Sequence, residues 1–318
     1  MALGGSQGRC GSTGRRATGV GGIRVAVATV FTILPIALLL RFFFTLDLRR
    51  EPRTTVAVTF LLGIVIALPA IFVSLVIAAI PGRSFGLFGG AAYGAFAVAA
   101  IPEELLKLLV IACYSARRRS FDEPMDGVVY GATAALGFAA MENVLYVAQG
   151  GWIVAVMRSV TAVPMHAAAG AILGYAIARR RLLLQRGAVW TGLAIAVLVH
   201  GLYDLGSMVL ARLGGDEAAY AAIGPVWLGC LGLSVAVVAT ALVGVRRLVL
   251  RLFRAQQMAG SALEAVAAPS RAAEGEDPLV AHLLERRSGH AALPADRGAA
   301  EDRAATDSGS SRTGPTVP

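Results

Sequence analysis

Long apolar runs are the feature that most constrains how this chain folds. A helix needs about 20 predominantly apolar residues to cross the roughly 30 Å hydrocarbon core of a bilayer. The 318-residue sequence contains seven runs of this kind, at residues 23–44, 56–80, 86–114, 126–147, 158–178, 188–212 and 222–245. The sequence therefore predicts an all-α fold, a polytopic transmembrane helix bundle of about seven spans, within a range of six to eight.

The composition also indicates a membrane protein. Hydrophobic residues make up 56% of the chain and charged residues 15%, and the mean hydropathy is +0.68. Soluble domains have roughly 45–50% apolar and about 25% charged residues. The net charge of +9 would suit nucleic acid, but the basic residues fall in short clusters between the apolar runs, where they anchor helices at a membrane surface. We expect the lipid bilayer as a partner, and no nucleic acid.

The two ends of the chain differ in composition from its apolar middle. Residues 1–22 are rich in Gly, Ser and Arg, and residues 255–318 are rich in Ala, Gly, Pro and Ser with scattered charges of both signs. Such segments have too little apolar surface to form a core. We expect a disordered N-terminal segment (1–22), a transmembrane domain (23–254) and a disordered tail (255–318). Because the run at 86–114 is long and contains Pro102, we expect it to kink or to split into two half-spans.

Arginine predicts the orientation in a cell membrane. Cytoplasmic loops of membrane proteins carry an excess of Lys and Arg. In a seven-span arrangement one face carries Arg41, Arg49, Arg50, Arg53, Arg117, Arg118, Arg119, Arg179, Arg180, Arg181, Arg186, Arg246, Arg247, Arg251 and Arg254. This face is predicted to be cytoplasmic, together with the C-terminal tail, which leaves the N-terminus outside.

Several ionisable side chains interrupt the apolar runs. Each costs roughly 2.5–3.5 kcal/mol at the centre of a membrane helix, so each must face the protein interior or a water-filled cavity. These side chains are Glu103, Glu104, Lys107, Glu142, His166, His200 and Asp204. Lys107 is the only lysine among the 29 Lys and Arg residues. We interpret this set as a candidate functional site.

The segment "IPEELLKLLV" at residues 101–110 carries two adjacent carboxylates and the lysine. On a helix Glu103 and Lys107 share a face, whereas Glu104 is rotated by about 100°. Lys107 either neutralises Glu103 and leaves Glu104 to face a cavity, or bridges the two with the assignment reversed. Pro102 places both carboxylates in a helix's first turn, where free N–H groups stabilise them. A purely structural ion pair is the alternative.

Three further clusters lie in the runs at 126–147, 188–212 and 158–178. In "GFAAMENVLYV", Glu142 is accompanied by Asn143, an amide that can hydrogen-bond across helices. In "HGLYDL", His200 and Asp204 are one turn apart, so imidazole and carboxylate can orient each other's proton or ligate a metal together. The fourth cluster is His166, which lies among small residues that allow a neighbouring backbone to approach closely. Each cluster taken alone also suits a polar clamp between helices.

Together the four clusters supply the parts of hydrolytic chemistry. A glutamate can take a proton from water, imidazoles can polarise or ligate, and a donor can stabilise an oxyanion. The candidate catalytic residues are Glu103, Glu104, Lys107, Glu142, Asn143, His166, His200 and Asp204. The ligand types of Glu142, His166, His200 and Asp204 suit a Zn²⁺ site with an open water position. A metal-free glutamate mechanism would use the same residues, with histidine and asparagine binding the oxyanion.

These motifs resemble a known family as an ordered set. Glu103-Glu104-x-x-Lys107, "EPMDGVVYG" at 123–131, "GFAAMEN" at 137–143, the segment from Arg158 to His166 with "GAILGYA", and His200-x-x-x-Asp204 are similar to the PrsW family of intramembrane proteases. The resemblance covers residues 60–205, and the family is related to the CAAX endopeptidase and Abi superfamily. Glu142 stands where CAAX-type relatives have histidine.

The resemblance implies peptide-bond hydrolysis in or near the bilayer of a bacterial cell membrane. Family members perform site-1-type cleavage of membrane-tethered anti-sigma factors, so the implied partner is a membrane-embedded or membrane-tethered protein substrate. A proton-coupled transporter is the first alternative, because such proteins also place Glu, His and Asp at membrane depth. However, the chain shows no internal repeat of the kind that many carriers have. A catalytically silent membrane interaction protein is the second alternative.

Overall fold

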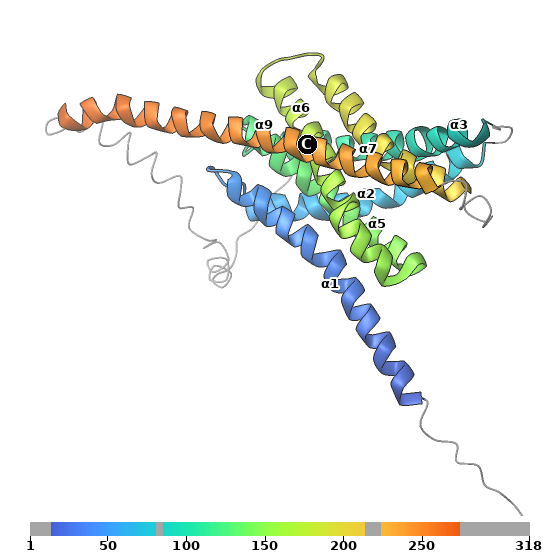
Figure 1. Ribbon diagram of the computed structural model, residues 1–318. Helices are drawn as coiled ribbons and strands as arrows, with labels where there is room; N and C mark the ends of the chain where they lie inside the picture. The colour runs from blue at the N-terminus through green and yellow to red at the C-terminus, as the bar shows by residue number, and fades with distance from the viewer. Residues whose placement is uncertain (1–13, 81–84, 214–223, 274–318) are drawn as a thin grey trace, which may run out of the picture. The chain divides into compact units, whose positions relative to one another are not determined.

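The computed structural model describes residues 14–80, 85–213 and 224–273, and every regular element in these ranges is helical (Figure 1). The elements are α1 (Gly14–Leu46), α2 (Arg53–Ala78), α3 (Gly86–Ala92), the π-helical η1 (Tyr93–Ala100), α4 (Ile101–Cys113), the 3₁₀ turn η2 (Ser115–Arg117), α5 (Pro124–Val160), α6 (Ala162–Leu182), α7 (Ala188–Leu213) and α9 (Gly224–Ala273). The predicted all-α helix bundle is confirmed. The chain divides into two compact units, Met1–Gln257 and Met258–Pro318, and the candidate site belongs to the first.

Six helical segments of the described chain are long and apolar enough to cross a membrane. They are Ala28–Leu46, Arg53–Ala78, Pro124–Gln149, Gly151–Leu182, Ala188–Val209 and Leu228–Ala262. This number lies within the predicted range of six to eight. The run expected at 86–114 does not form one long α-helix but is divided into α3, η1 and α4.

The division of this run follows from Pro102. Proline has no backbone N–H, and its ring crowds the carbonyl four residues earlier, so the regular α-helical bonding pattern cannot continue through it. The π-helical η1 ends at Ala100, and Pro102 lies in the first turn of α4. The wider turns of η1 change the direction in which α4 presents Glu103 and Glu104. Short π-helical segments of this kind are frequent at functional sites.

The helices extend further toward both ends than the sequence indicated. The first helix, α1, begins at Gly14, inside the segment expected to be disordered, and α9 extends to Ala273, beyond the expected boundary at 254. The stretch 255–273 is rich in alanine, which has the highest helix propensity of all residues. Residues 1–13 and 274–318 lie outside the described part of the chain.

The helix α5 packs against α1, α2 and α6 (Figure 1). Its contact with α6 uses two pairs of glycines spaced four residues apart, Gly127 and Gly131 on α5 and Gly170 and Gly174 on α6. A Cβ atom at Gly174 would lie 1.7 Å from the carbonyl oxygen of Gly127, and one at Gly131 would lie 2.1 Å from that of Gly170. Small residues allow such close backbone contact between membrane helices. The close approach expected around His166 is therefore present.

The helix α2 makes a similarly close contact with α5. A Cβ atom at Gly63 would lie 2.1 Å from the carbonyl oxygen of Ala134, and one at Gly137 would lie 2.1 Å from that of Phe60. This contact places α2 beside the part of α5 that carries Glu142. Further along, α5 is interrupted at Gly151, whose φ of 70° and ψ of −161° are not helical. The chain turns there before α6 begins.

Candidate functional site

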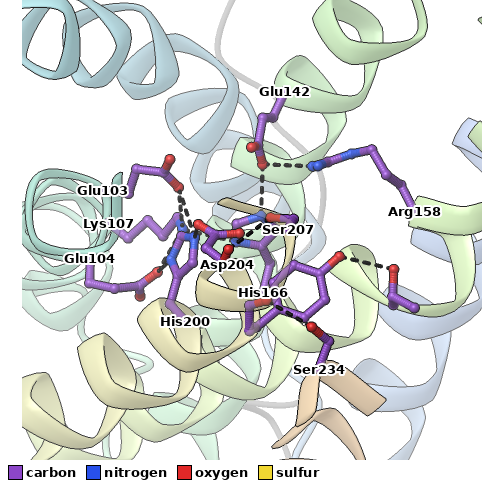
Figure 2. A network of polar contacts seen from close by, with 12 residues as sticks. Glu103, Glu104, Lys107, Glu142, Arg158, His166, His200, Asp204, Ser207 and Ser234 are labelled. Atoms are coloured by element: carbon purple, nitrogen blue, oxygen red, sulfur yellow. Dashed lines mark hydrogen bonds and ion pairs between the residues drawn. The ribbon is translucent and has the colours of Figure 1, made fainter. Parts of the chain in front are cut away.

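Polar side chains from α4, α5, α6 and α7 form one buried network (Figure 2). The four sequence clusters that supply them lie on separate helices, as the sequence analysis expected. The members that take part directly are Glu103, Glu104, Lys107, Glu142, His166, His200 and Asp204. Asn143 joins this network at its edge through Arg158, which was not among the candidate residues.

Lys107 lies at the centre of this network. Its Nζ atom is 2.8 Å from Glu104 Oε1 and 3.3 Å from Glu103 Oε2, so the lysine bridges the two carboxylates. Lys107 and Glu104 are completely buried, whereas the Glu103 side chain keeps 12% of its surface exposed. The ammonium group also lies 4.1 Å from the centre of the Phe138 ring. Of the two arrangements considered from the sequence, the structure has Lys107 bridging and Glu103 as the more accessible carboxylate.

His166 connects this centre to α5. Its Nδ1 atom is 3.0 Å from Lys107 Nζ, and its Nε2 atom is 2.7 Å from Glu142 Oε2. The ring is 1% exposed. One ring nitrogen of His166 therefore faces the centre of the network, and the other is held by a carboxylate at its edge.

His200 is placed in the same way from α7. Its Nδ1 atom is 2.7 Å from Glu104 Oε1, and its Nε2 atom is 3.2 Å from Asp204 Oδ2. The rings of His166 and His200 meet edge to face, with 5.0 Å between their centres. Both imidazoles thus present Nδ1 toward Glu104 and Lys107, while Glu142 and Asp204 hold the outer nitrogens.

Arg158 is a member of the network that the sequence analysis quoted within a motif but did not select as a site residue. It lies after the interruption of α5 at Gly151, and its Nη2 atom is 2.9 Å from Glu142 Oε2 (Figure 2). Its Nε–H group donates to Asn143 Oδ1 at 2.6 Å. Its position at the start of an apolar run, away from the arginine-rich clusters, is the sequence signal that could have identified it.

A cavity of about 330 Å³ reaches this network between α2, η1 and α5. Glu103, Phe138, Glu142 and Tyr146 contribute to its wall, and most of the remaining wall is apolar. Glu104 does not line it. A larger apolar cavity of about 570 Å³ lies among α6, α7 and α9 and contains none of the network's carboxylates or histidines. Of these two cavities, only the smaller one gives another molecule access to the polar site.

Comparison with known proteins assigns this chain to a family. The model of the PrsW family of intramembrane metalloproteases matches residues 51–243, which is more than half of the chain. The chain belongs to the PrsW family. Protease PrsW of Geobacillus kaustophilus is 33% identical over 171 residues, covering 53% of this chain and 74% of that protein. Protease PrsW of Bacillus subtilis is 34% identical over 172 residues, covering 53% and 77%. No solved structure matches the chain.

Membership of the PrsW family confirms the main functional prediction. The chain is an intramembrane protease and hence a peptidase, and with six apolar helices it is a multi-pass membrane protein. This finding favours the protease over the transporter and over the silent interaction protein. The family match also includes the "EPMDGVVYG" segment and all four clusters that the structure brings together.

The donor groups of this PrsW-family site suit a metal ion. Glu103, Glu104, His166 and His200 each offer one ligand atom, and these atoms lie within 4.8 Å of one another. In addition, Glu104 Oε2 is buried without a hydrogen-bond partner. This group shares His166 and His200 with the set that the sequence suggested for zinc, but it has Glu103 and Glu104 in place of Glu142 and Asp204.

Proposed function

We propose that this chain hydrolyses peptide bonds of membrane-tethered proteins and that Glu103 is the general base. The observation that carries this assignment is the unequal burial of the paired glutamates. Glu103 lines the cavity of about 330 Å³, whereas Glu104 is completely buried beneath it. A general base must come within hydrogen-bond reach of the water that it activates. Of the two carboxylates, only Glu103 meets this requirement.

Glu104 then acts as a positioning residue, and Lys107 provides electrostatic stabilisation. The carboxylate of Glu104 holds both the Lys107 ammonium and the His200 ring, at 2.8 and 2.7 Å. The positive charge of Lys107 lies beside Glu103, on the side where negative charge develops as water adds to the scissile carbonyl. In a site shielded from bulk water, a fixed positive charge stabilises such an oxyanion more strongly than it would in solution.

Glu142 and Asp204 orient the two histidines. A carboxylate on one ring nitrogen fixes the tautomer and the direction of an imidazole, and this arrangement is usual for histidines that bind a metal. Arg158 and Asn143 hold Glu142 in turn, through contacts of 2.9 and 2.6 Å along the chain Glu142–Arg158–Asn143. This role differs from the ligand role that the sequence suggested for Glu142 and Asp204.

We further propose that Glu104, His166 and His200 would hold a Zn²⁺ ion, which leaves Glu103 free as the base. Two histidines and one glutamate are a known ligand set of catalytic zinc. When bound, zinc supplies Lewis acidity at the scissile carbonyl. The ion would compete with Lys107, whose ammonium contacts Glu104 and His166 here. Elemental analysis of the purified protein, with activity before and after chelation, tests this: stoichiometric zinc and loss of activity support it, and full activity without metal contradicts it.

The cavity suggests how the substrate reaches Glu103. It lies between α2 and α5, beside apolar side chains of α2 that face outward, such as Leu75. A peptide bond inside a transmembrane helix has its polar groups already hydrogen-bonded. We therefore expect the substrate to present an extended segment next to its membrane anchor. An anti-sigma factor with a single span is one protein of this kind.

The orientation that we propose counts the α3–η1–α4 segment as a seventh crossing and places the arginine-rich face and the C-terminal tail in the cytoplasm. Glu103 and Glu104 precede the end of α4 at Cys113 by about 14–15 Å along the helix axis. They therefore lie away from that face, at about half the depth of the roughly 30 Å hydrocarbon core. In a protein without its native cysteines, Arg119→Cys should react with a membrane-impermeant thiol reagent only from the cytoplasm and Trp152→Cys only from outside. The reverse pattern would invert the orientation.

A membrane-tethered reporter expressed beside the protease tests the assignment of the base. Cleavage should require the wild-type chain and should fall by about 10²- to 10⁴-fold in Glu103→Gln, the range expected for the loss of general-base catalysis. Asp122→Asn, which removes an exposed carboxylate away from the site, is the matched control and should cleave normally. Full cleavage by Glu103→Gln at equal protein levels would refute this role.

A further inference from the structure

Three buried carboxylates form a second polar cluster at the start of α5. Asp47 and Glu51 belong to the segment between α1 and α2, and Asp126 lies in the first turn of α5. Their exposed fractions are 2%, 4% and 1%. One oxygen atom from each lies within 4.8 Å of the others. About 16 residues of α5 separate Asp126 from Glu142, or roughly 24 Å along the helix, so this cluster is separate from the proteolytic site.

The carboxylates receive only a few neutral donors. Asp126 Oδ2 accepts the backbone N–H groups of Asp122 and Glu123, at 2.8 and 2.7 Å, and the Tyr130 hydroxyl donates to Glu51. Asp47 Oδ1 accepts the Arg49 backbone N–H group at 3.0 Å. Asp126 and Tyr130 belong to the motif "EPMDGVVYG", and neither takes part in the network around Glu103 and Lys107.

One oxygen of this cluster has no partner. Asp47 Oδ1 also accepts the side-chain amide of Gln256 at 3.1 Å, but Asp47 Oδ2 is buried without a hydrogen bond. Asp47 is 98% shielded from solvent, and it supplies one of the three clustered oxygens. A buried carboxylate oxygen without a donor is costly, and a missing ligand is one explanation for it.

No positive charge compensates the cluster. Within the described ranges, no Lys, Arg or His nitrogen lies within 4.0 Å of the carboxylates of Asp47, Glu51 or Asp126. The nearest ion pair joins Arg49 to Glu123 instead, and Arg49 is largely exposed. Burial accordingly raises the pKa of Asp47 and the pKa of Glu51 above their usual values. When ionised, these carboxylates have no counter-charge among the described residues.

We propose that Asp47, Glu51 and Asp126 bind a divalent cation of the Mg²⁺ or Ca²⁺ type. Ligands made only of oxygen select these hard cations over zinc or copper. A bound cation would connect the turn between α1 and α2 to the start of α5, the helix that also carries Glu142 further along. The site stabilises the arrangement of these helices and does not depend on the proposed function of the proteolytic site.

Thermal unfolding of the full-length protein in detergent tests this proposal. After treatment with EDTA, adding millimolar Mg²⁺ or Ca²⁺ in separate samples should raise the Tm by roughly 5 °C for at least one of the two, in a saturable manner. The rise should disappear in Asp47→Asn and persist in Asp122→Asn, the matched control. It should also persist in His166→Ala, which excludes binding at the proteolytic site. A rise that survives in Asp47→Asn, or no rise with either ion, would overturn the proposal.

Terbium provides a second measurement that does not depend on stability. Tb³⁺ occupies oxygen-ligand sites of this type, and a nearby tyrosine sensitises its luminescence. Tyr130, whose hydroxyl contacts Glu51, is placed to do this. We expect one equivalent of Tb³⁺ to luminesce on excitation of tyrosine, with a strong loss of signal in Tyr130→Phe and displacement by Ca²⁺ or Mg²⁺. The absence of sensitised luminescence in the folded wild-type protein would show that protons, not a cation, neutralise the three carboxylates.

Discussion

Glu104 of α4 and His200 of α7 are 96 positions apart in the chain, yet Glu104 Oε1 and His200 Nδ1 lie 2.7 Å from each other. The same oxygen accepts a hydrogen bond from Lys107 at 2.8 Å. The buried carboxylate of Glu104 therefore connects α4 to α7 and also holds Lys107, the lysine beside Glu103. This arrangement gives the paired glutamates different roles, which their substitution should separate.

Replacement of Glu104 should destabilise the protein more than replacement of Glu103. In Glu104→Gln the buried Lys107 ammonium keeps a single carboxylate, that of Glu103 at the longer distance of 3.3 Å, and removing one partner of a buried ion pair costs about 3–5 kcal/mol. Glu103→Gln changes a group at the cavity wall, where water can solvate the amide. Thermal unfolding in detergent should show a clearly lower Tm for Glu104→Gln. Equal losses, or a larger loss for Glu103→Gln, would contradict the roles assigned here.

Arg158→Lys should lower kcat by about 10-fold although the positive charge is kept. Lysine cannot reproduce the planar group that contacts both Glu142 and Asn143, so Glu142 would hold His166 less firmly. Kinetics with a purified tethered substrate should show the change mainly in kcat and not in KM. The exposed Arg119 provides the matched control, because Arg119→Lys should leave both constants unchanged. An unchanged kcat in Arg158→Lys would show that Arg158 does not orient Glu142.

The sequence predicted more of the site's residues than of its geometry. Charged and imidazole side chains at membrane depth are costly, so Glu104, His166 and His200 were conspicuous within apolar runs. The separate runs at 126–147 and 158–178 predict a break around Gly151 but not the direction in which the chain continues, so Arg158 was not selected. Asp47 and Glu51 were also missed, since acidic residues at the ends of spans are ordinary at a membrane surface.

The spans and the break near Pro102 could be predicted from the sequence, but not the π-helical form that the chain takes at this break. Run length and hydropathy predicted the helices correctly because they follow from the thickness of the bilayer. The π-helical η1 depends on how Pro102 disturbs the preceding turns and on packing against α2 and α7, which a single sequence does not display. The unequal exposure of Glu103 and Glu104 is a consequence of that local geometry.

Gly174→Ala should destabilise the contact between α5 and α6. The added methyl group would lie 1.7 Å from the carbonyl oxygen of Gly127, so the two backbones would have to separate and lose packing along the interface. Gly232→Ala is the matched control, because a Cβ atom at this helical glycine meets nothing within 4 Å. We expect a lower Tm and loss of activity for Gly174→Ala alone. A wild-type Tm for this variant would show that the helices do not meet at these glycines.

Lys107→Met should strengthen zinc binding while lowering activity. The substitution removes the ammonium group that contacts Glu104 and His166, so a divalent cation would no longer compete with a positive charge for these ligands. Zinc content after dialysis against a graded series of chelator concentrations compares the two proteins. Weaker zinc retention by Lys107→Met than by the wild type would argue against a zinc site at Glu104, His166 and His200.

Cleavage by the purified protein in water enriched in ¹⁸O tests the central claim most directly. The wild-type chain and Glu103→Gln are reconstituted separately into lipid vesicles with a single-span reporter, and the products are analysed by mass spectrometry. The account predicts that the wild type produces a fragment whose new C-terminal carboxylate contains ¹⁸O, as hydrolysis requires. Folded Glu103→Gln should produce at least about 10²-fold less of this fragment. Equal product from both proteins, or none from the correctly folded wild type, would contradict hydrolysis at Glu103.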